Sequence, residues 1–375
     1  MTSKRFPGFP RFCGLMALAL LLAGGCTRAP RPAEPAGDTV VEISDLTSDA
    51  EQWADSVLGH MSLERKAAQL FMPAVYSSSD YWTLRQVAEY ARIGVGGLVL
   101  LKGDTLGVKS IADTIGKSAV PPFVSIDAEW GLAMRLEGTK RYSANGELPD
   151  SVSEEWMFDY GAEVGADARR LGINMVLGPV ADVNVPGGFI GRRSFGGDEE
   201  RVARLAVAYG RGLQSEGVIG VAKHFPGHGS VTSDSHRSKG VITRSLAEID
   251  SIDLHPFRAW VDGGLPAVMV GHLAVPSIDP ESLPAAVSPT VIGDLLRGDL
   301  GFGGLVLTDA MSMGGAERAG ADRAVEAGAD LILAPVDTEA EIAGVVAAVK
   351  EGRLAQSKLD AAVRRILVYK YLYAR

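Results

Sequence analysis

The sequence has few cysteines and no excess of basic residues, and each shortage excludes a class of protein. Only Cys13 and Cys26 occur among the 375 residues, which excludes a disulfide-stapled scaffold and a cysteine-rich metal site. Asp and Glu outnumber Lys and Arg by 46 to 37, and the resulting net charge of −9 argues against nucleic-acid binding, which needs a basic face. Charged residues make up 22% and hydrophobic residues 46% of the chain, a balance typical of globular rather than disordered proteins.

The N-terminal apolar run Leu15–Ala23 is too short to cross a membrane as a mature helix, which needs about 20 apolar residues. It follows the basic residues Lys4, Arg5 and Arg11, so it fits the core of a signal peptide. Small residues then precede Cys26, a sequence that resembles a bacterial lipobox, in which the cysteine is lipidated and becomes the new N-terminus. The alternative is an ordinary signal peptide with a chance cysteine. Cleavage before Cys26 would remove three positive and no negative charges, which changes the net charge from −9 to −12.

Three segments are therefore expected along the chain. Residues 1–25 are predicted to be a lipoprotein signal peptide. Residues 26–50 contain Pro30, Pro32, Pro35 and Gly37 without periodic apolar positions, and are predicted to be a flexible tether. Residues 51–375 are predicted to form the folded domain. The mature protein is expected to be exported and anchored to a membrane through Cys26, facing the periplasm or the cell exterior.

From about residue 51, short apolar runs alternate with amphipathic segments of helical periodicity. Continuous apolar runs are typical of parallel strands that are buried on both faces. Eight such runs in roughly 320 residues predict an α/β fold, a single (β/α)₈ barrel. The runs are Ala68–Val75, Gly96–Leu101, Pro122–Asp127, Ile173–Val183, Val218–Phe225, Ala267–Leu273, Gly304–Asp309 and Ala329–Pro335.

A doubly wound sheet is the alternative α/β arrangement. It is disfavoured because no Gly-rich dinucleotide-binding motif follows an early strand. The glycines of Gly94–Gly97 precede their predicted strand, which is typical of a helix-to-strand turn. No composition shift marks a linker to a second domain.

Titratable side chains occur at the ends of five of these runs, where a barrel places its chemistry. Charged groups at so many strand ends are hard to explain as core residues. They are Asp127, Asp182, Lys223 with His224, His272 and Asp309.

Each of these residues also has an ordinary structural interpretation. Asp127 and Asp182 could cap the helices that follow them, and His272 could be a packed, hydrogen-bonded residue. Of Arg192 and Arg193, which follow the fourth run, at most one is expected to contact a ligand. Lys223 is different, because a lysine at the end of an apolar strand rarely enters the interior without a partner.

Three histidines, His224, His228 and His236, follow closely on one another and raise the possibility of a metal site. However, Pro226 and the glycines beside it prevent a helix, so the four-residue spacing does not place two imidazoles on one helical face. No cysteine and no HExxH pattern supports zinc. The sequence therefore predicts no metal ion and no cofactor, with a metal-dependent barrel hydrolase as an alternative.

Acid/base chemistry is the second interpretation of this segment. Asp234 and His236 lie two residues apart on a loop, close enough for the carboxylate to hold the imidazole in one tautomer and raise its pKa. Such a pair can deliver and retrieve a proton near neutral pH.

These motifs together resemble glycoside hydrolase family 3, in its bacterial β-N-acetylglucosaminidase branch. The resemblance covers most of the chain from about residue 60. It is carried by Lys223–Gly229 (KHFPGHG) with Asp234–His236 (DSH), Leu307–Met313 (LTDAMSM), Pro179–Asn184 (PVADVN), Arg193–Gly196 (RSFG) and the weaker Asp127–Gly131 (DAEWG).

The resemblance implies a retaining exo-glycosidase that releases terminal GlcNAc from peptidoglycan fragments or chitin oligomers through a covalent glycosyl-enzyme. Asp309 would be the nucleophile and His236 the general acid and base, with Asp234 as its partner. Sugar hydroxyls would be bound by Asp127, Arg193, Lys223 and His224, with Arg135 from the following loop, while His228 and His272 would belong to the pocket.

One departure from the family pattern affects the leaving-group side. The turn after the third run reads Asp127–Gly131, DAEWG, so that Trp130 replaces a small residue beside the sugar. Trp130 could stack on a sugar, narrow the leaving-group side or pack beneath the loop. The alternatives kept open are a β-glucosidase or GlcNAc phosphorylase of the same family, and a non-catalytic glycan-binding lipoprotein.

Overall fold

The computed structural model of the chain describes residues 43–116, 118, 120–231, 240–313 and 320–375. The predicted signal peptide, Cys26, Asp234 and His236 lie outside these ranges. Among the helices of the described residues, none combines the length and the apolar character needed to cross a membrane.

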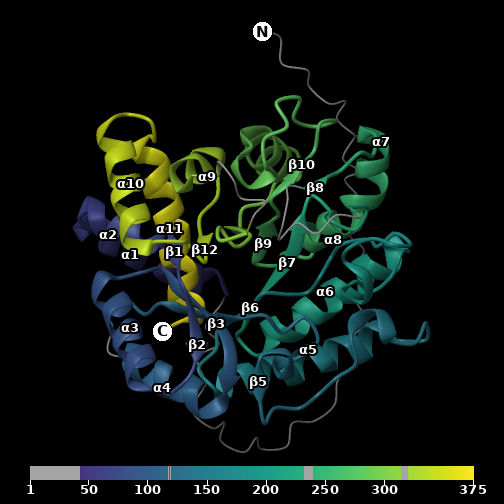
Figure 1. Ribbon diagram of the computed structural model, residues 1–375, viewed down its shortest axis with the longest axis horizontal. Helices are drawn as coiled ribbons and strands as arrows, with labels where there is room; N and C mark the ends of the chain where they lie inside the picture. The colour runs from purple at the N-terminus through teal and green to yellow at the C-terminus, as the bar shows by residue number, and fades with distance from the viewer. Residues whose placement is uncertain (1–42, 117, 119, 232–239, 314–319) are drawn as a thin grey trace, which may run out of the picture. The chain divides into compact units, whose positions relative to one another are not determined.

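The principal strands form a closed ring of eight parallel positions (Figure 1). Strands β1 and β2, which flank Pro73, share the first position, and β3, β4, β6, β7, β9, β11 and β12 follow in that order. The ring closes because β12 pairs in parallel with β1, while Leu331 beside β12 bridges to Leu307 of β11. The predicted (β/α)₈ barrel is thereby confirmed. The strands are β1 Phe71–Met72, β2 Ala74–Ser77, β3 Gly97–Asp104, β4 Phe123–Ile126, β5 Leu136–Glu137, β6 Met175–Val176, β7 Ile219–Phe225, β8 Gly240–Val241, β9 Ala267–Val270, β10 Leu273–Ala274, β11 Leu305–Thr308 and β12 Ile332–Leu333.

Helices surround these strands (Figure 1). Many begin at a Ser or Asp whose side chain accepts a backbone N–H of the first turn, as Asp80 does for α3 and Asp337 for α10. The α-helices are α1 Ile43–His60, α2 Leu63–Gln69, α3 Tyr81–Ile93, α4 Thr105–Ile115, α5 Glu154–Arg170, α6 Glu199–Ser215, α7 Leu246–Glu248, α8 His255–Asp262, α9 Ala321–Ala327, α10 Thr338–Lys350 and α11 Gln356–Tyr373. The 3₁₀ turns are η1 Leu132–Met134, η2 Asn145–Glu147, η3 Gly191–Arg193 and η5 Ala285–Val287, and the π-helical segments are η4 Ile249–Asp253 and η6 Thr290–Asp299.

All eight predicted apolar runs contain a strand, because the barrel interior and the surrounding helices bury both strand faces. Every residue of β4, β7, β9 and β11 is buried. Two predicted boundaries need correction. Ala68 belongs to α2, not to the first strand, and the predicted tether of residues 26–50 overlaps α1, which begins at Ile43.

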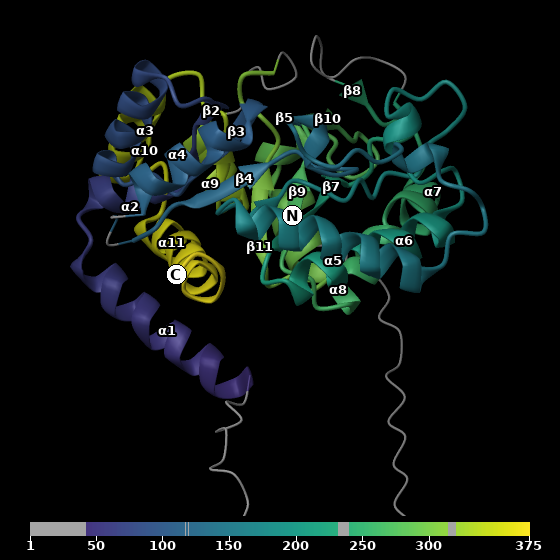
Figure 2. The same ribbon diagram turned by 90° about the horizontal axis from the view of Figure 1, so that it is seen from below.

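Helix α1 is part of the folded domain because it packs on α11. The rings of Trp53 and Tyr371 are 5.8 Å apart, and Asp55 pairs with Arg364 at 2.6 Å. Figure 2 shows these two helices together at the end of the molecule away from β8 and β10. The apolar residues Ala50, Trp53, Ala54 and Val57 repeat at helical spacing, which is the signal for this helix in the sequence.

Helix α11 lies across the N-terminal end of the barrel and places Lys370 there. Its ammonium group is fully buried, donates to Oε1 of Gln69 at 2.7 Å and lies 5.6 Å from the centre of the Phe123 ring. No carboxylate of the described residues pairs with it. Burial therefore lowers the pKa of Lys370 from 10.5 to about 7.

Replacing Lys370 with methionine is expected to raise the free energy of unfolding most at and below neutral pH. Between pH 7 and 10.5 the unfolded chain holds the lysine proton that the folded chain has lost, so wild-type stability rises with pH. The advantage of Lys370→Met should shrink over that range by up to ~1.4 kcal/mol per pH unit. Urea denaturation at several pH values measures it, with Lys358→Met on the exposed face of α11 as control. An advantage that is constant with pH would contradict the prediction.

Candidate active site

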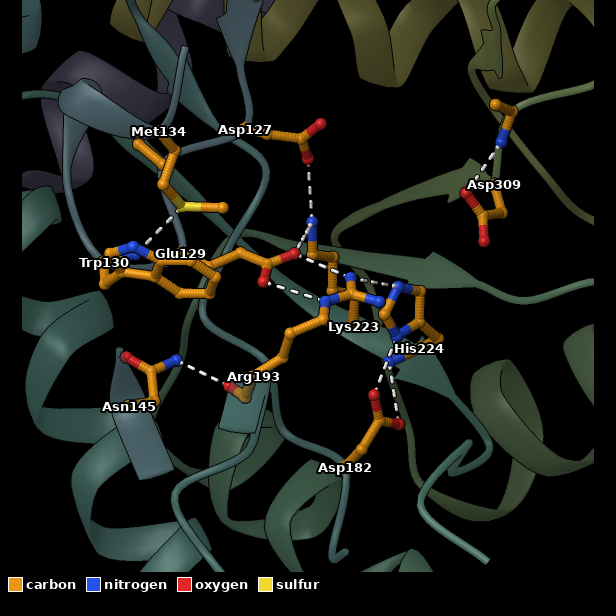
Figure 3. Close-up of polar contacts among 12 residues, drawn as sticks. Asp127, Glu129, Trp130, Met134, Asn145, Asp182, Arg193, Lys223, His224 and Asp309 are labelled. Atoms are coloured by element: carbon orange, nitrogen blue, oxygen red, sulfur yellow. Dashed lines mark hydrogen bonds and ion pairs between the residues drawn. The ribbon is translucent and has the colours of Figure 1, made fainter. Parts of the chain in front are cut away.

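A cavity of about 560 Å³ opens at the C-terminal ends of the barrel strands. Its wall includes charged side chains from four strand ends, together with apolar residues such as Met134 and Leu333. Figure 3 shows the polar contacts among these residues. A larger cavity of about 710 Å³ lies elsewhere, between η5, η6 and α9, and contains none of the predicted site residues.

Lys223 is the centre of a buried ionic cluster. It lies in β7, next to His224, to which it is joined by a cis peptide bond. Its Nζ atom contacts Oδ1 of Asp127 at 2.8 Å and Oε1 of Glu129 at 2.7 Å. Burial opposes each charge, yet the attraction between them prevails: the pKa of Lys223 is raised, that of Glu129 is lowered to about 2, and that of Asp127 is lowered further.

Two arginines complete this cluster. Arg193 in η3 binds Glu129 through two hydrogen bonds of 3.0 and 2.7 Å, a bidentate pair that fixes both side chains. Arg135 donates to Oδ2 of Asp127 at 2.7 Å. The carbonyl of Arg193 is held in turn by the side chain of Asn145 at 2.8 Å. The cluster is thus rigid and presents charged hydrogen-bonding groups to the cavity.

His224 is oriented by Asp182. Its Nδ1 lies 2.7 Å from Oδ2 of Asp182, and its Nε2 lies 3.3 Å from Nη2 of Arg193. In the neutral ring these partners select the tautomer with the proton on Nδ1, because Nε2 faces a donor. Both ring nitrogens are therefore engaged by protein groups, which argues against His224 as a metal ligand. Within the described ranges, no group of three or more His, Cys, Asp or Glu side chains is placed to hold a metal ion.

Glycines let the loop after β7 pack closely on its neighbours, and at Gly229 it packs directly on the segment after β6. A Cβ at Gly229 would lie 2.0 Å from the carbonyl oxygen of Val183, and Gly227 has a φ of +131°, which L side chains rarely adopt. This close approach lets Oδ1 of Asp182 accept the backbone N–H of His228 at 2.7 Å. Asp182 thereby fixes the start of the loop that leads to the predicted acid/base residues.

Asp309 follows β11 and lines the same cavity. Figure 3 shows it set apart from the group of Asp127, Glu129 and Lys223. Its Oδ1 accepts the backbone N–H of Ala310 at 2.8 Å, and its carbonyl oxygen lies 3.1 Å from Nε2 of His272. Burial raises the pKa of Asp309, but the interactions with His224 and His272 and the Ala310 hydrogen bond outweigh it, so the pKa lies below its ordinary value. Asp309 is therefore a buried carboxylate that stays ionised near neutral pH.

The other residues predicted for the pocket, His228, His272 and Trp130, differ in whether they line the cavity. His228 and Trp130 line the cavity, and burial lowers the pKa of His228. His272 is buried beside the Asp309 backbone, and burial lowers its pKa as well. The Trp130 ring lies 5.9 Å from the guanidinium of Arg192, which is exposed and pairs with Glu147. Arg193 thus points inward and Arg192 outward.

The structure brings together Asp127, Arg135, Arg193, Lys223 and His224 as one connected cluster. Helix capping is the wrong interpretation of Asp127 and Asp182, because the next helices, α5 and α6, are capped by Ser153 and Asp198. Asp234 and His236 lie outside the described residues, so their roles stay predictions.

The sequence analysis assigned no role to Glu129, and it identified Asp182 as a strand-end carboxylate but not as the partner of His224. A lysine buried at the end of a strand needs partners of opposite charge. This need was the signal in the sequence for Glu129, which lies two residues beyond Asp127 and pairs with Lys223. No local pattern identifies Asp182 as the partner of His224, because the two residues are 42 positions apart.

This arrangement combines two chemical capacities. The cluster around Lys223 offers charged donors and acceptors at fixed positions, which suits a ligand rich in hydroxyl groups. Asp309 offers a carboxylate that can stabilise or trap a developing positive charge.

Comparison with known proteins supports a family assignment. Residues 62–369 match the profile described as "Glycosyl hydrolase family 3 N terminal domain". The chain is 34% identical to the β-hexosaminidase LpqI of Mycobacterium tuberculosis, with 96% of this chain and 97% of that protein covered.

Two further relatives are longer than this chain. It is 30% identical to a β-N-acetylglucosaminidase/β-glucosidase of Cellulomonas fimi, of which it spans 60%, while 87% of this chain is covered. The solved structure of a family 3 β-N-acetylglucosaminidase from Paenibacillus sp. superposes with a TM-score of 0.76 at 34% identity, covering 84% of this chain and 63% of the other. The chain therefore spans less than two thirds of these two proteins.

Proposed function

Because the chain belongs to glycoside hydrolase family 3, we propose that it is a retaining, exo-acting β-N-acetylglucosaminidase. Its substrates would be GlcNAc-terminated peptidoglycan fragments or chitin oligosaccharides. The observation that carries this proposal is the ionised Asp309 in one cavity with the cluster of Asp127, Glu129, Arg193, Lys223 and His224. A terminal sugar fits such a site because its hydroxyls meet charged partners while its anomeric carbon faces a carboxylate.

The reaction proceeds in two steps. Asp309 attacks the anomeric carbon, the bond to the glycosidic oxygen breaks, and a proton passes to the departing oxygen. We assign that proton to His236, held by Asp234. In the second step, His236 removes a proton from water as the water oxygen displaces Asp309 and releases the sugar.

The use of a histidine in place of a second carboxylate affects the choice of acceptor. Most retaining glycosidases carry two carboxylates about 5–5.5 Å apart, and a carboxylate repels an anionic acceptor. A neutral or cationic imidazole repels phosphate less, so phosphate can compete with water in the second step. GlcNAc 1-phosphate would then be the product.

The proposal is tested with the purified full-length chain on a chromogenic β-GlcNAc glycoside and its β-glucoside counterpart, with and without phosphate. Faster turnover of the GlcNAc glycoside is expected. Faster turnover of the glucoside would favour a β-glucosidase, an activity that the name of the Cellulomonas relative also includes. A folded protein that cleaves neither glycoside would overturn the enzymatic proposal and leave the non-catalytic alternative.

We propose that the protein is an exported lipoprotein, attached to the membrane through a lipid on Cys26. The support is the order of basic residues, a short apolar run and small residues before that cysteine. Cys26→Ser should move the protein from the membrane fraction to the soluble fraction, because one cysteine carries the whole attachment and a net charge of −12 gives no attraction to an anionic surface. A Cys26→Ser protein that stays with the membrane would contradict this, with Cys13→Ser as the control.

A further inference from the structure

A buried ion pair lies against the loop after β7. Asp253, the last residue of η4, is fully buried, and its Oδ1 accepts a hydrogen bond of 2.6 Å from Nη1 of Arg244. Arg244 is largely buried as well, since only 16% of its side chain is exposed. Neither residue is among the described residues that line the active-site cavity, so the pair lies outside the site itself.

Asp253 packs directly on the start of the loop. A Cβ at Gly227 would lie 2.6 Å from Cβ of Asp253 and 3.1 Å from its Oδ1, so any side chain at position 227 would collide with the carboxylate. The backbone N–H of the next residue, His228, donates to Asp182 at 2.7 Å. Two buried carboxylates therefore fix the loop at successive residues.

Arg244 lies at the other end of the same loop. It follows β8, the strand at which the loop ends, by three residues, and β8 is held by parallel pairing with β10 (Figure 1). The two ends also lie in contact, because a Cβ at Gly240 would be 2.9 Å from Cγ1 of Val231. The ion pair therefore connects the two ends: Asp253 packs on the first and Arg244 belongs to the second.

The chain between these ends carries the residues that we assign to proton transfer. Asp234 and His236 lie between Val231 and Gly240 in the sequence. A residue in a short segment can reach only the positions that both ends of the segment allow, so the placement of the ends limits where an imidazole can act. Misplacing a catalytic group by about 1 Å can lower a rate about 100-fold.

Stability does not account for the pair. Oδ2 of Asp253 is buried and has no hydrogen-bond partner within the described ranges. Burial raises the pKa of Asp253 to about 6 against the opposite effect of Arg244, and the charges of Asp182 and Glu248 add to the rise. Because the folded chain then binds this proton more tightly than the unfolded chain, the ionised carboxylate lowers the free energy of unfolding near neutral pH. A buried charge that weakens the fold indicates a functional role.

We propose that Asp253 and Arg244 are positioning residues that fix both ends of the loop carrying the acid/base histidine. This inference rests on the proposed glycosidase function and deepens it, because it assigns the alignment of the proton donor to a pair outside the cavity. When Asp253 loses its charge, the two ends lose their shared anchor, and His236 protonates the departing oxygen less effectively. Attack by Asp309 is unaffected, because that carboxylate follows β11.

The test compares leaving groups that differ in their need for a proton. A dinitrophenolate departs without one, whereas the leaving sugar of the β-1,4-linked GlcNAc disaccharide must receive one. Asp253→Asn should lower kcat/KM of the full-length chain about tenfold for the disaccharide and no more than about twofold for the dinitrophenyl β-GlcNAc glycoside. Arg244→Gln should show the same difference, and Arg244→Lys should recover most of the loss.

Asp330→Asn is the matched control. Asp330 is also fully buried and pairs with Arg297 at 2.7 Å, and 17% of the Arg297 side chain is exposed. This pair lies near the start of β11, where Asp330 accepts the backbone N–H of Val306, and so at the end of the barrel away from the loop. Asp330→Asn should leave the ratio of the two kcat/KM values as it is in wild type.

The outcomes separate this inference from the proposed function. Equal losses on both substrates in Asp253→Asn and Arg244→Gln, or wild-type kinetics in both variants, would overturn the positioning role while the glycosidase function stands. If Asp253→Asn does not fold, the Arg244 variants decide, and an unchanged ratio of the two kcat/KM values in Arg244→Gln overturns the inference. A wild-type chain that releases no GlcNAc from any substrate would overturn the proposed function itself, and this inference with it.

Discussion

Replacing Asp309 with alanine is expected to lower kcat for an aryl β-N-acetylglucosaminide by about 10⁴-fold or more. The variant lacks the carboxylate that we propose as the nucleophile, and no other described carboxylate in the cavity is free to replace it. Asp127 and Glu129 are already neutralised by Lys223, Arg135 and Arg193. Steady-state kinetics with the purified full-length chain measures the loss.

Asp309→Asn is the matched variant, because it keeps the volume and removes the charge. It should be nearly as inactive as Asp309→Ala. A small anion such as azide can enter the space left by the alanine and attack the anomeric carbon, so azide should restore turnover to Asp309→Ala only. Near-native rates in either variant would show that Asp309 is not the nucleophile.

Replacing Lys223 with methionine is expected to lower the free energy of unfolding by about 3–5 kcal/mol and to abolish measurable turnover. The substitution leaves Asp127 and Glu129 buried without the ammonium group that both contact. Glu129 would keep Arg193 and Asp127 would keep Arg135, so the protein should still fold, with a lower midpoint in urea. Urea denaturation followed by fluorescence measures the change.

Arg192→Met is the control for this variant. Arg192 is a neighbouring cation, but its ion pair with Glu147 is exposed, so its loss should change stability by no more than ~0.5 kcal/mol. Adding Asp127→Asn to Lys223→Met should return part of the stability, because one uncompensated charge disappears. A Lys223→Met protein as stable as wild type would mean that the buried cluster contributes nothing to folding.

The barrel could be predicted because its strands are buried on both faces. Burial on both faces requires apolar residues at successive positions, and such runs are visible without knowledge of their neighbours. The first run was placed too early because Ala68 is equally suited to the buried side of α2. Helix α1 was missed because its apolar residues begin within the stretch that was assigned to the tether.

The candidate site could be predicted only as a set of strand ends. A titratable group at the end of an apolar strand is rarely buried without a partner or a function. Four residues therefore stand out in the sequence: Asp127, Lys223, His224 and Asp309. Glu129 does not stand out, and Asp182 stands out as a strand end without showing its partner, since an acidic residue in a turn has many ordinary roles. Their importance comes from contacts with residues 94 and 42 positions away in the sequence, Lys223 and His224 respectively.

The sequence by itself determined the alternation of strands and helices, the identity of the family and the strand ends that line the candidate site. These properties follow from apolar periodicity and from motifs that are local in the chain. The tertiary structure alone decided which charges meet. Pairing of β6 with β4 on one side and β7 on the other sets the ends of these strands side by side, so Lys223 lies between two carboxylates and His224 faces Asp182. The fold likewise places Lys370 of α11 beneath the barrel, against Gln69 and Phe123, because residues that are far apart in the chain become neighbours once the strands close.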